Sequence, residues 1–163
     1  MTPETLEWLS LRAPGFVELS EDEKNVIVDF SFLWSLFEGT VLNGNCNVQI
    51  IRDYVVSLGQ DGRLQALVVE PYLEYLKNRY YRNGDVTEYF NGLHLNRSGN
   101  PIEVITALSN EDASKEEQVI GCLIILYRLR NNLFHGEKWQ YQLQGQFNNF
   151  LQANGFIKHM MEL

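Results

Sequence analysis

The chain lacks the residue patterns that mark membrane proteins, disulfide-rich domains and the commonest metal and nucleotide sites. No apolar run reaches the roughly 18–20 residues that cross a bilayer, and residues 1–10 carry no basic cluster like that of a signal peptide. The two cysteines, Cys46 and Cys122, have no metal-ligand spacing, and no glycine-rich phosphate-binding motif occurs. These absences predict a cytoplasmic chain with reduced thiols, no membrane contact, no metal and no cofactor.

Positive charge is also scarce, because 13 Lys and Arg stand against 21 Asp and Glu, for a formal net charge of −8. This balance argues against a general attraction to nucleic acid or anionic membranes. The basic residues are unevenly placed, however. Eight of the 13 fall within one stretch of the chain: Lys77, Arg79, Arg82, Arg97, Lys115, Arg128, Arg130 and Lys138. The sequence is therefore compatible with a locally basic surface on an acidic protein.

Apolar residues make up 45% of the chain, and where they recur every three to four positions they predict helices. No segment shows sustained alternation, so a sheet is not expected. The prediction is an all-α, single-domain bundle over residues 1–163, with a central antiparallel helix pair formed by 21–42 and 114–135. The expected helices are 21–42, 48–58 (or a strand, from its β-branched residues), 62–81 with a break or a new first turn at Pro71, 84–93, 101–110, 114–135 and a C-terminal helix broken or ended near Gly155. Residues 94–100 are expected to form a loop.

The helix expected at 114–135 begins as apolar core and ends in a polar cluster. Asn131 and His135 are four residues apart and share one helix face. Arg130 lies about 140° round the axis from His135, and its long side chain can reach the groove that the imidazole borders. These groups, at the negative end of a helix dipole, suit an anion such as a phosphodiester. Spacing alone leaves the alternative open that the helix simply ends in water, capped by Gly136.

The stretch "RNNLFH" (130–135) resembles the signature of the HEPN superfamily (higher eukaryotes and prokaryotes nucleotide-binding), in which Arg and a polar residue precede His after four to six intervening positions. The longer string "LRNNLFHGEK" is especially similar to bacterial Apea-like HEPN proteins. The resemblance implies metal-independent RNA cleavage by 2′-hydroxyl attack, in a homodimer whose two motifs face each other. Arg130 would hold the scissile phosphate, His135 would transfer a proton or position the phosphate, and Asn131 would orient either group.

The resemblance also implies a role in toxin–antitoxin or antiphage defence, with an antitoxin or another protein as partner. One position departs from the pattern, since Glu137 stands where toxins paired with minimal nucleotidyltransferases carry a modified tyrosine. Many HEPN members are inactive. The alternative function is therefore a catalytically silent dimerisation module that binds nucleotide, RNA or a partner protein.

Further RNA-binding candidates are basic residues near the motif or among tyrosines. Arg128 and Lys138 flank the motif, while Lys77, Arg79 and Arg82 lie in "KNRYYRNGD", which combines positive charge with stacking surfaces. The same stretch also fits a solvated helix end whose tyrosines pack on the core. Glu38 would meet Arg130 if helices 21–42 and 114–135 are antiparallel neighbours, either as an ion-pair partner or simply as a surface carboxylate.

Overall fold

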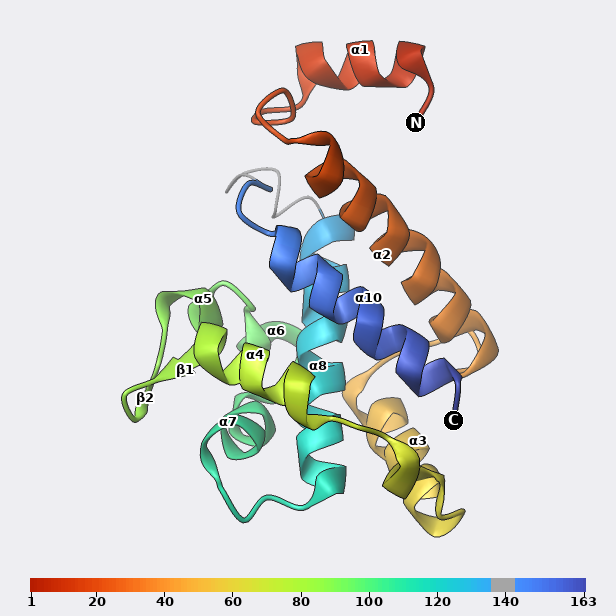
Figure 1. Cartoon of the computed structure of the whole chain (residues 1–163), viewed down its shortest axis with the longest axis vertical. Coiled ribbons are helices and arrows are strands. Elements are labelled where there is room, and N and C mark those ends of the chain that lie inside the picture. The colour runs from red at the N-terminus through yellow and green to blue at the C-terminus, as the bar shows by residue number, and fades with distance from the viewer. Residues whose placement is uncertain (136–142) are drawn as a thin grey trace.

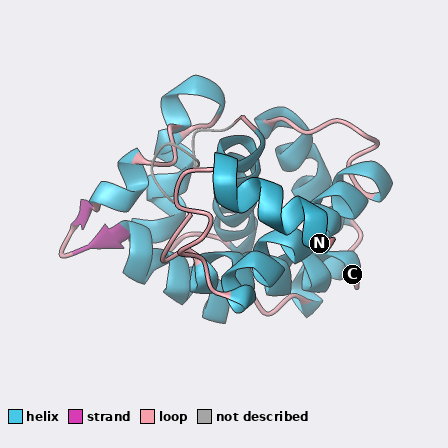
Figure 2. Cartoon of the chain, turned by 90° about the horizontal axis from the view of Figure 1, so that it is seen from above, coloured by secondary structure: helices cyan, strands magenta, loops and turns pink. Residues whose placement is uncertain are grey.

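The computed structural model describes residues 1–135 and 143–163, and it confirms the all-α prediction (Figure 1). Seen from above, the described residues form helices joined by loops, with one small hairpin at an edge (Figure 2). No helix in the described ranges is long and apolar enough to cross a membrane. The elements are α1 (Pro3–Arg12), α2 (Glu21–Thr40), α3 (Val48–Gln60), η1 (Arg63–Ala66), α4 (Glu70–Tyr80), β1 (Tyr81–Arg82), β2 (Asp85–Val86), α5 (Glu88–Asn91), α6 (Leu95–Ser98), α7 (Pro101–Ser109), α8 (Lys115–Phe134) and α10 (Phe147–Met161).

Helix α8 is the centre of the bundle. Ser114 and Glu117 form a reciprocal capping box at its start, each side chain accepting a hydrogen bond from the other residue's backbone N–H. From Val119 onward almost every side chain is buried, because α7 packs closely on one side and α3 on another. The helix thus carries the polar motif at its C-terminal end into the bundle.

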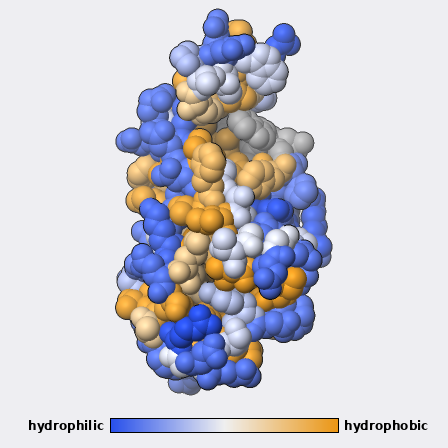
Figure 3. All heavy atoms as spheres, turned by 90° about the vertical axis from the view of Figure 1, so that its right-hand side faces the viewer, coloured by the Kyte–Doolittle hydropathy of each residue, from blue (hydrophilic) through white to orange (hydrophobic). Residues whose placement is uncertain are grey.

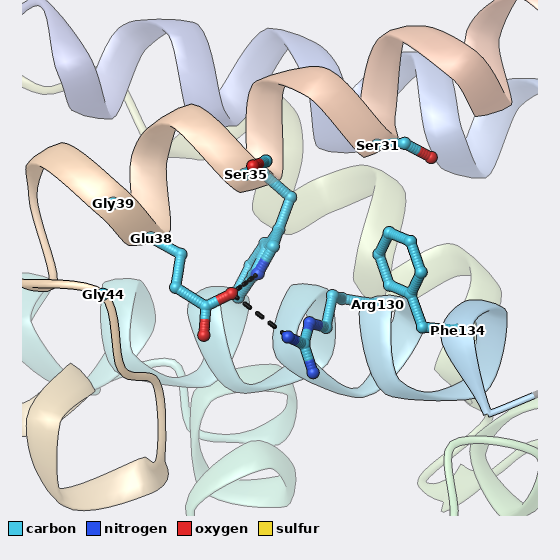
Figure 4. A pocket seen from close by; sticks show the side chains of 8 residues that line it. Ser31, Ser35, Glu38, Gly39, Gly44, Arg130 and Phe134 are labelled. Atoms are coloured by element: carbon cyan, nitrogen blue, oxygen red, sulfur yellow. Dashed lines mark hydrogen bonds and ion pairs between the residues drawn. The ribbon is translucent and has the colours of Figure 1, made fainter.

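Helix α2 runs antiparallel to α8 where the two meet (Figure 4), but its most extensive packing is with α10. Phe30 of α2 stacks against Phe150 of α10 with ring centroids 5.1 Å apart. The buried amide of Asn154 donates a hydrogen bond to the carbonyl of Val26 at 3.0 Å. The two helices predicted to form the central pair therefore meet only at a crossing, because α2 packs mainly on α10 and α8 packs mainly on α7.

Four local expectations differ from the structure. The segment 62–81 is not one helix, because η1 ends at Ala66 and α4 begins at Glu70, with Pro71 in its first turn. Residues 84–93 were expected to be one helix, but Asn83 and Gly84 both have positive φ and close a hairpin between β1 and β2, as Asn-Gly turns favour. The expected loop at 94–100 contains the short helix α6. Helix α10 continues through Gly155, where the missing side chain leaves room for the Tyr72 ring of α4.

One outer face of the bundle is apolar. Figure 3 views the side on which α2 lies and shows hydrophobic atoms gathered down its middle. Phe32 and Leu36 of α2 are four positions apart and are 74% and 52% exposed. The solvent-exposed side of α2, opposite its buried residues, therefore carries large apolar side chains.

Candidate functional site

The polar end of α8 divides into a buried and an accessible set of side chains. Arg128, Asn131 and Asn132 are 4%, 6% and 2% exposed. Arg130 is half-buried, with a side chain 29% exposed, and His135 is exposed. Burying polar groups requires hydrogen bonds that replace water, so each buried side chain should have structural partners.

Arg128 meets this expectation and is a structural arginine. Its Nε donates to the carbonyl of Leu93 at 2.7 Å, and its other nitrogens donate to Ser98 Oγ and to Asn132 Oδ1. The amide of Asn132 in turn donates to the carbonyl of Gly92 at 2.8 Å. These bonds attach the segment around α6 to α8. The donors that bond Leu93, Ser98 and Asn132 are thus used inside the protein, and a contact between Arg128 and RNA stays a prediction.

Arg130 links the motif to α2. Its guanidinium donates to Asn131 Oδ1 at 2.9 Å and forms an ion pair with Glu38 Oε2 at 3.3 Å, which is the contact predicted from antiparallel helices. The indole Nε1 of Trp34 donates to the same oxygen at 2.8 Å. Figure 4 shows the Glu38 carboxylate directed toward the Arg130 guanidinium from the opposite helix. The buried Nε of Arg130 has no acceptor within the described ranges.

His135 caps α8. Its backbone N–H donates to the carbonyl of Asn131 at 2.9 Å, so the imidazole leaves the helix from the last turn. Asn131 lies between the helix and α6, where its amide donates to Ser98 Oγ at 3.4 Å. The side chains of Asn131 and His135 border the same cavity, as their spacing predicted.

This His135 cavity has a volume of about 380 Å³ and is strongly basic. It is lined by Arg97, Ser98, Tyr127, Arg128, Arg130, Asn131, Asn132 and His135. Within the described part of the chain, the lining contains three arginines and a histidine but no carboxylate. On a protein of net charge −8, such a concavity concentrates positive potential and favours an anionic ligand.

Lys77, Arg79 and Arg82, three further predicted RNA contacts, do not line this cavity. Arg79 stacks over Tyr89 with its guanidinium carbon 4.5 Å from the ring centroid, and it donates to Gln146 at the start of α10. Arg82 is exposed and donates to the carbonyl of Asn78, and Lys77 is half-buried. Lys138 lies outside the described residues, as do Gly136 and Glu137.

Arg97 and Ser98 are cavity residues that the sequence did not indicate. They lie in α6, more than 30 positions before the motif, and both are exposed. The only signal was a lone arginine in the expected loop 94–100. Hydrogen bonds from Arg128 and Asn132 place this segment against α8. No local sequence pattern predicts these long-range bonds.

Metal-ligating clusters and reactive thiols are not part of the site. No group of three His, Cys, Asp or Glu within the described ranges is placed to hold a metal ion. Cys46 and Cys122 are free and buried, and burial raises the pKa of each thiol to about 12. The nearby Glu38 charge adds to the effect at Cys46.

Comparisons with models of protein families, with curated protein sequences and with solved structures find no match to this chain.

Proposed function

We propose that this chain is a metal-independent endoribonuclease of the HEPN type. The observation that carries the proposal is the His135 cavity, where Arg130, Asn131 and His135 meet Arg97 in a concave surface without a carboxylate. Anion binding by arginine, combined with an exposed imidazole, suits general acid–base chemistry at a phosphodiester. The resemblance of "RNNLFH" to the HEPN signature points to RNA as the substrate.

The reaction is transesterification followed by release of one product strand. The 2′-hydroxyl oxygen attacks the adjacent phosphorus, the bond to the 5′-oxygen breaks, and the products carry a 2′,3′-cyclic phosphate and a 5′-hydroxyl. Arg130 binds the non-bridging oxygens and stabilises the added negative charge. Asn131 and Glu38 hold the guanidinium from two sides. His135 accepts the proton from the 2′-hydroxyl or donates one to the leaving oxygen.

A homodimer follows from this chemistry, because one motif supplies one histidine whereas the reaction benefits from both a proton acceptor and a proton donor. A two-fold dimer brings two copies of His135 together. His135 and the 55% exposed Phe134 are accessible at the same helix end. Sedimentation at micromolar concentration should therefore give a dimer, and an active monomer would contradict this part of the proposal.

The second candidate is a catalytically silent module that binds RNA, nucleotide or a protein partner such as an antitoxin. One observation favours it: the Arg130 guanidinium is already occupied by Glu38 and Asn131 in the protein alone. A phosphate would have to share or displace those contacts. For either candidate function, we propose a biological role in toxin–antitoxin or antiphage defence.

The test is incubation of purified protein with mixed RNAs, with and without EDTA. We expect cleavage in both conditions, products with 2′,3′-cyclic phosphate ends, and intact DNA, which lacks the 2′-hydroxyl. His135→Ala should lower the rate by about 10²–10⁴-fold, as loss of a proton-transfer group does.

His159→Ala is the matched control, because His159 is also exposed but lies on α10 and bonds Tyr72 at 2.8 Å. Equal cleavage by His135→Ala and wild type would remove the enzymatic proposal. RNA binding without cleavage would favour the silent module.

A further inference from the structure

Arg130 borders a second cavity on the side of α8 that faces α2 (Figure 4). This Glu38 cavity has a volume of about 390 Å³ and is lined by Ser31, Trp34, Ser35, Glu38, Gly39, Gly44, Arg130 and Phe134. Within the described part of the chain, Arg130 is the one residue that lines both this cavity and the His135 cavity. Small-ligand pockets usually span about 300–1,000 Å³, so the Glu38 cavity can hold one planar group attached to a phosphate at Arg130.

The polar chemistry of the Glu38 cavity differs from that of its neighbour. It contains one carboxylate and one guanidinium, so its formal charge is balanced. Trp34 and Arg130 both donate to Glu38 Oε2, and this fixes the carboxylate in one orientation. Nothing among the described residues donates to the other oxygen, Oε1. The carboxylate side chain is 17% exposed and therefore offers one oriented acceptor to a ligand.

An aromatic surface lies beside this acceptor. The ring of Phe134 is 55% exposed although it belongs to the most buried helix of the protein. The Arg130 guanidinium carbon lies 5.5 Å from its centroid. Aromatic rings and guanidinium planes are the surfaces on which unpaired RNA bases stack. A charge-balanced cavity with a stacking surface and a fixed acceptor suits a base better than a second phosphate.

We propose that the Glu38 cavity is a nucleobase subsite that selects bases carrying an exocyclic amino group. The inference rests on the proposed function, since it places the base next to the phosphate held by Arg130. Glu38 Oε1 accepts a hydrogen bond from the amino group of cytosine, the pairing that carboxylates make with this base. Uracil presents a carbonyl at that position, so two acceptors would oppose each other unless the base shifts to place its N3–H against Glu38. With the base held by its phosphate at Arg130, that shift disfavours uracil.

Binding of cytidine and uridine 3′-monophosphate tests this inference without requiring catalysis. On the edge of the base that would face Glu38, cytosine carries an amino group where uracil carries a carbonyl. The adjacent ring nitrogen is unprotonated in cytosine and protonated in uracil. A hydrogen bond to a charged group predicts that the cytidine ligand binds about 10–100-fold more tightly, measured by calorimetry. Glu38→Gln, whose amide can also donate, should abolish or reverse this preference.

A variant that adds bulk at the cavity wall supplies the steric test. Gly39 lines the cavity, and a Cβ built there meets no atom within 4 Å, so Gly39→Leu adds a large side chain at this wall without a clash at its Cβ. We expect it to weaken binding of the cytidine ligand at least tenfold. Thr40→Leu is the matched control, because Thr40 is exposed and adjacent but does not line the cavity. It should bind like wild type.

The outcomes separate this inference from the proposed function. Equal affinity for the two monophosphates, no binding of either at millimolar concentration, or unchanged binding by Gly39→Leu would overturn the base subsite. RNA cleavage by wild type under those circumstances would leave the ribonuclease proposal standing. A cytidine preference that Gly39→Leu removes, in a protein that cleaves no RNA, would support the subsite and overturn the enzyme.

Discussion

Arg128 and Arg130 are two positions apart in α8 and should respond in opposite ways to replacement by methionine, which keeps the length of the side chain and removes its charge. Arg128 is 4% exposed and bonds Leu93, Ser98 and Asn132. Arg130 borders two cavities and pairs with Glu38 at the surface. Arg128→Met should therefore lower stability, and Arg130→Met should lower RNA cleavage.

The expected losses in unfolding free energy follow from how deeply each arginine is buried. Hydrogen bonds from a charged donor contribute about 1.5–3 kcal/mol each, but removing Arg128 also relieves the desolvation cost of a buried cation. The net loss should be about 2–4 kcal/mol. The Arg130–Glu38 pair is partly exposed, with side chains 29% and 17% accessible, and solvent screening limits its contribution to about 1 kcal/mol. At about 2–4 °C per kcal/mol, Arg128→Met should lower the Tm by about 5–15 °C and Arg130→Met by less than about 4 °C.

Thermal unfolding followed by circular dichroism, together with RNA cleavage at a temperature where all variants are folded, measures both effects. Arg52→Met is a suitable control, because Arg52 pairs with Glu103 at 2.7 Å and both side chains are about as exposed as Arg130. It should resemble Arg130→Met in stability and wild type in cleavage. If Arg128→Met melted like wild type, the buried network would not stabilise the fold. If Arg130→Met cleaved like wild type, Arg130 would not bind the phosphate.

Three further outcomes are expected. Leu123→Ala, at a fully buried position of α8, should cost about 2–5 kcal/mol of unfolding free energy in denaturant titrations while leaving cleavage intact in the folded protein; an equal loss of activity would contradict it. Since burial raises the pKa of both Cys46 and Cys122 to about 12, iodoacetamide at pH 8 should label them only after unfolding, and rapid labelling of the native protein would refute this. Hydrogen bonds from the backbone N–H groups of Ser20 and Gly145 lower the pKa of the Glu23 carboxyl. The ionised carboxylate therefore stabilises the folded protein fully above its unfolded pKa of about 4.3, and this stabilisation is lost as the pH falls through the lower pKa of the folded state. Wild type should exceed Glu23→Gln in stability at pH 6, and the difference should shrink on acidification; a constant difference would argue against the linkage.

The sequence by itself determined the fold class and most of the long helices. Apolar spacing predicted α2 and α8, and the structure shows a serine capping box at the start of each, at Ser20 and Ser114. These signals are local, because a cap and a periodic apolar face depend on residues within one or two helical turns. The ion pair between Glu38 and Arg130 was one of two alternatives that the sequence left open, and the structure shows it.

Only the tertiary structure decided which polar residues of α8 are accessible. Apolar periodicity indicates the buried face of a helix that has one solvated side, but α8 is covered on nearly every side, and even the charged Arg128 is buried in it. Local sequence therefore could not separate the structural Arg128 from the accessible Arg130. The approach of Arg97 and Ser98, and the cavity between α2 and α8, depend on contacts between residues 30 or more positions apart. Such contacts are fixed by the packing of whole helices rather than by the propensity of any short segment.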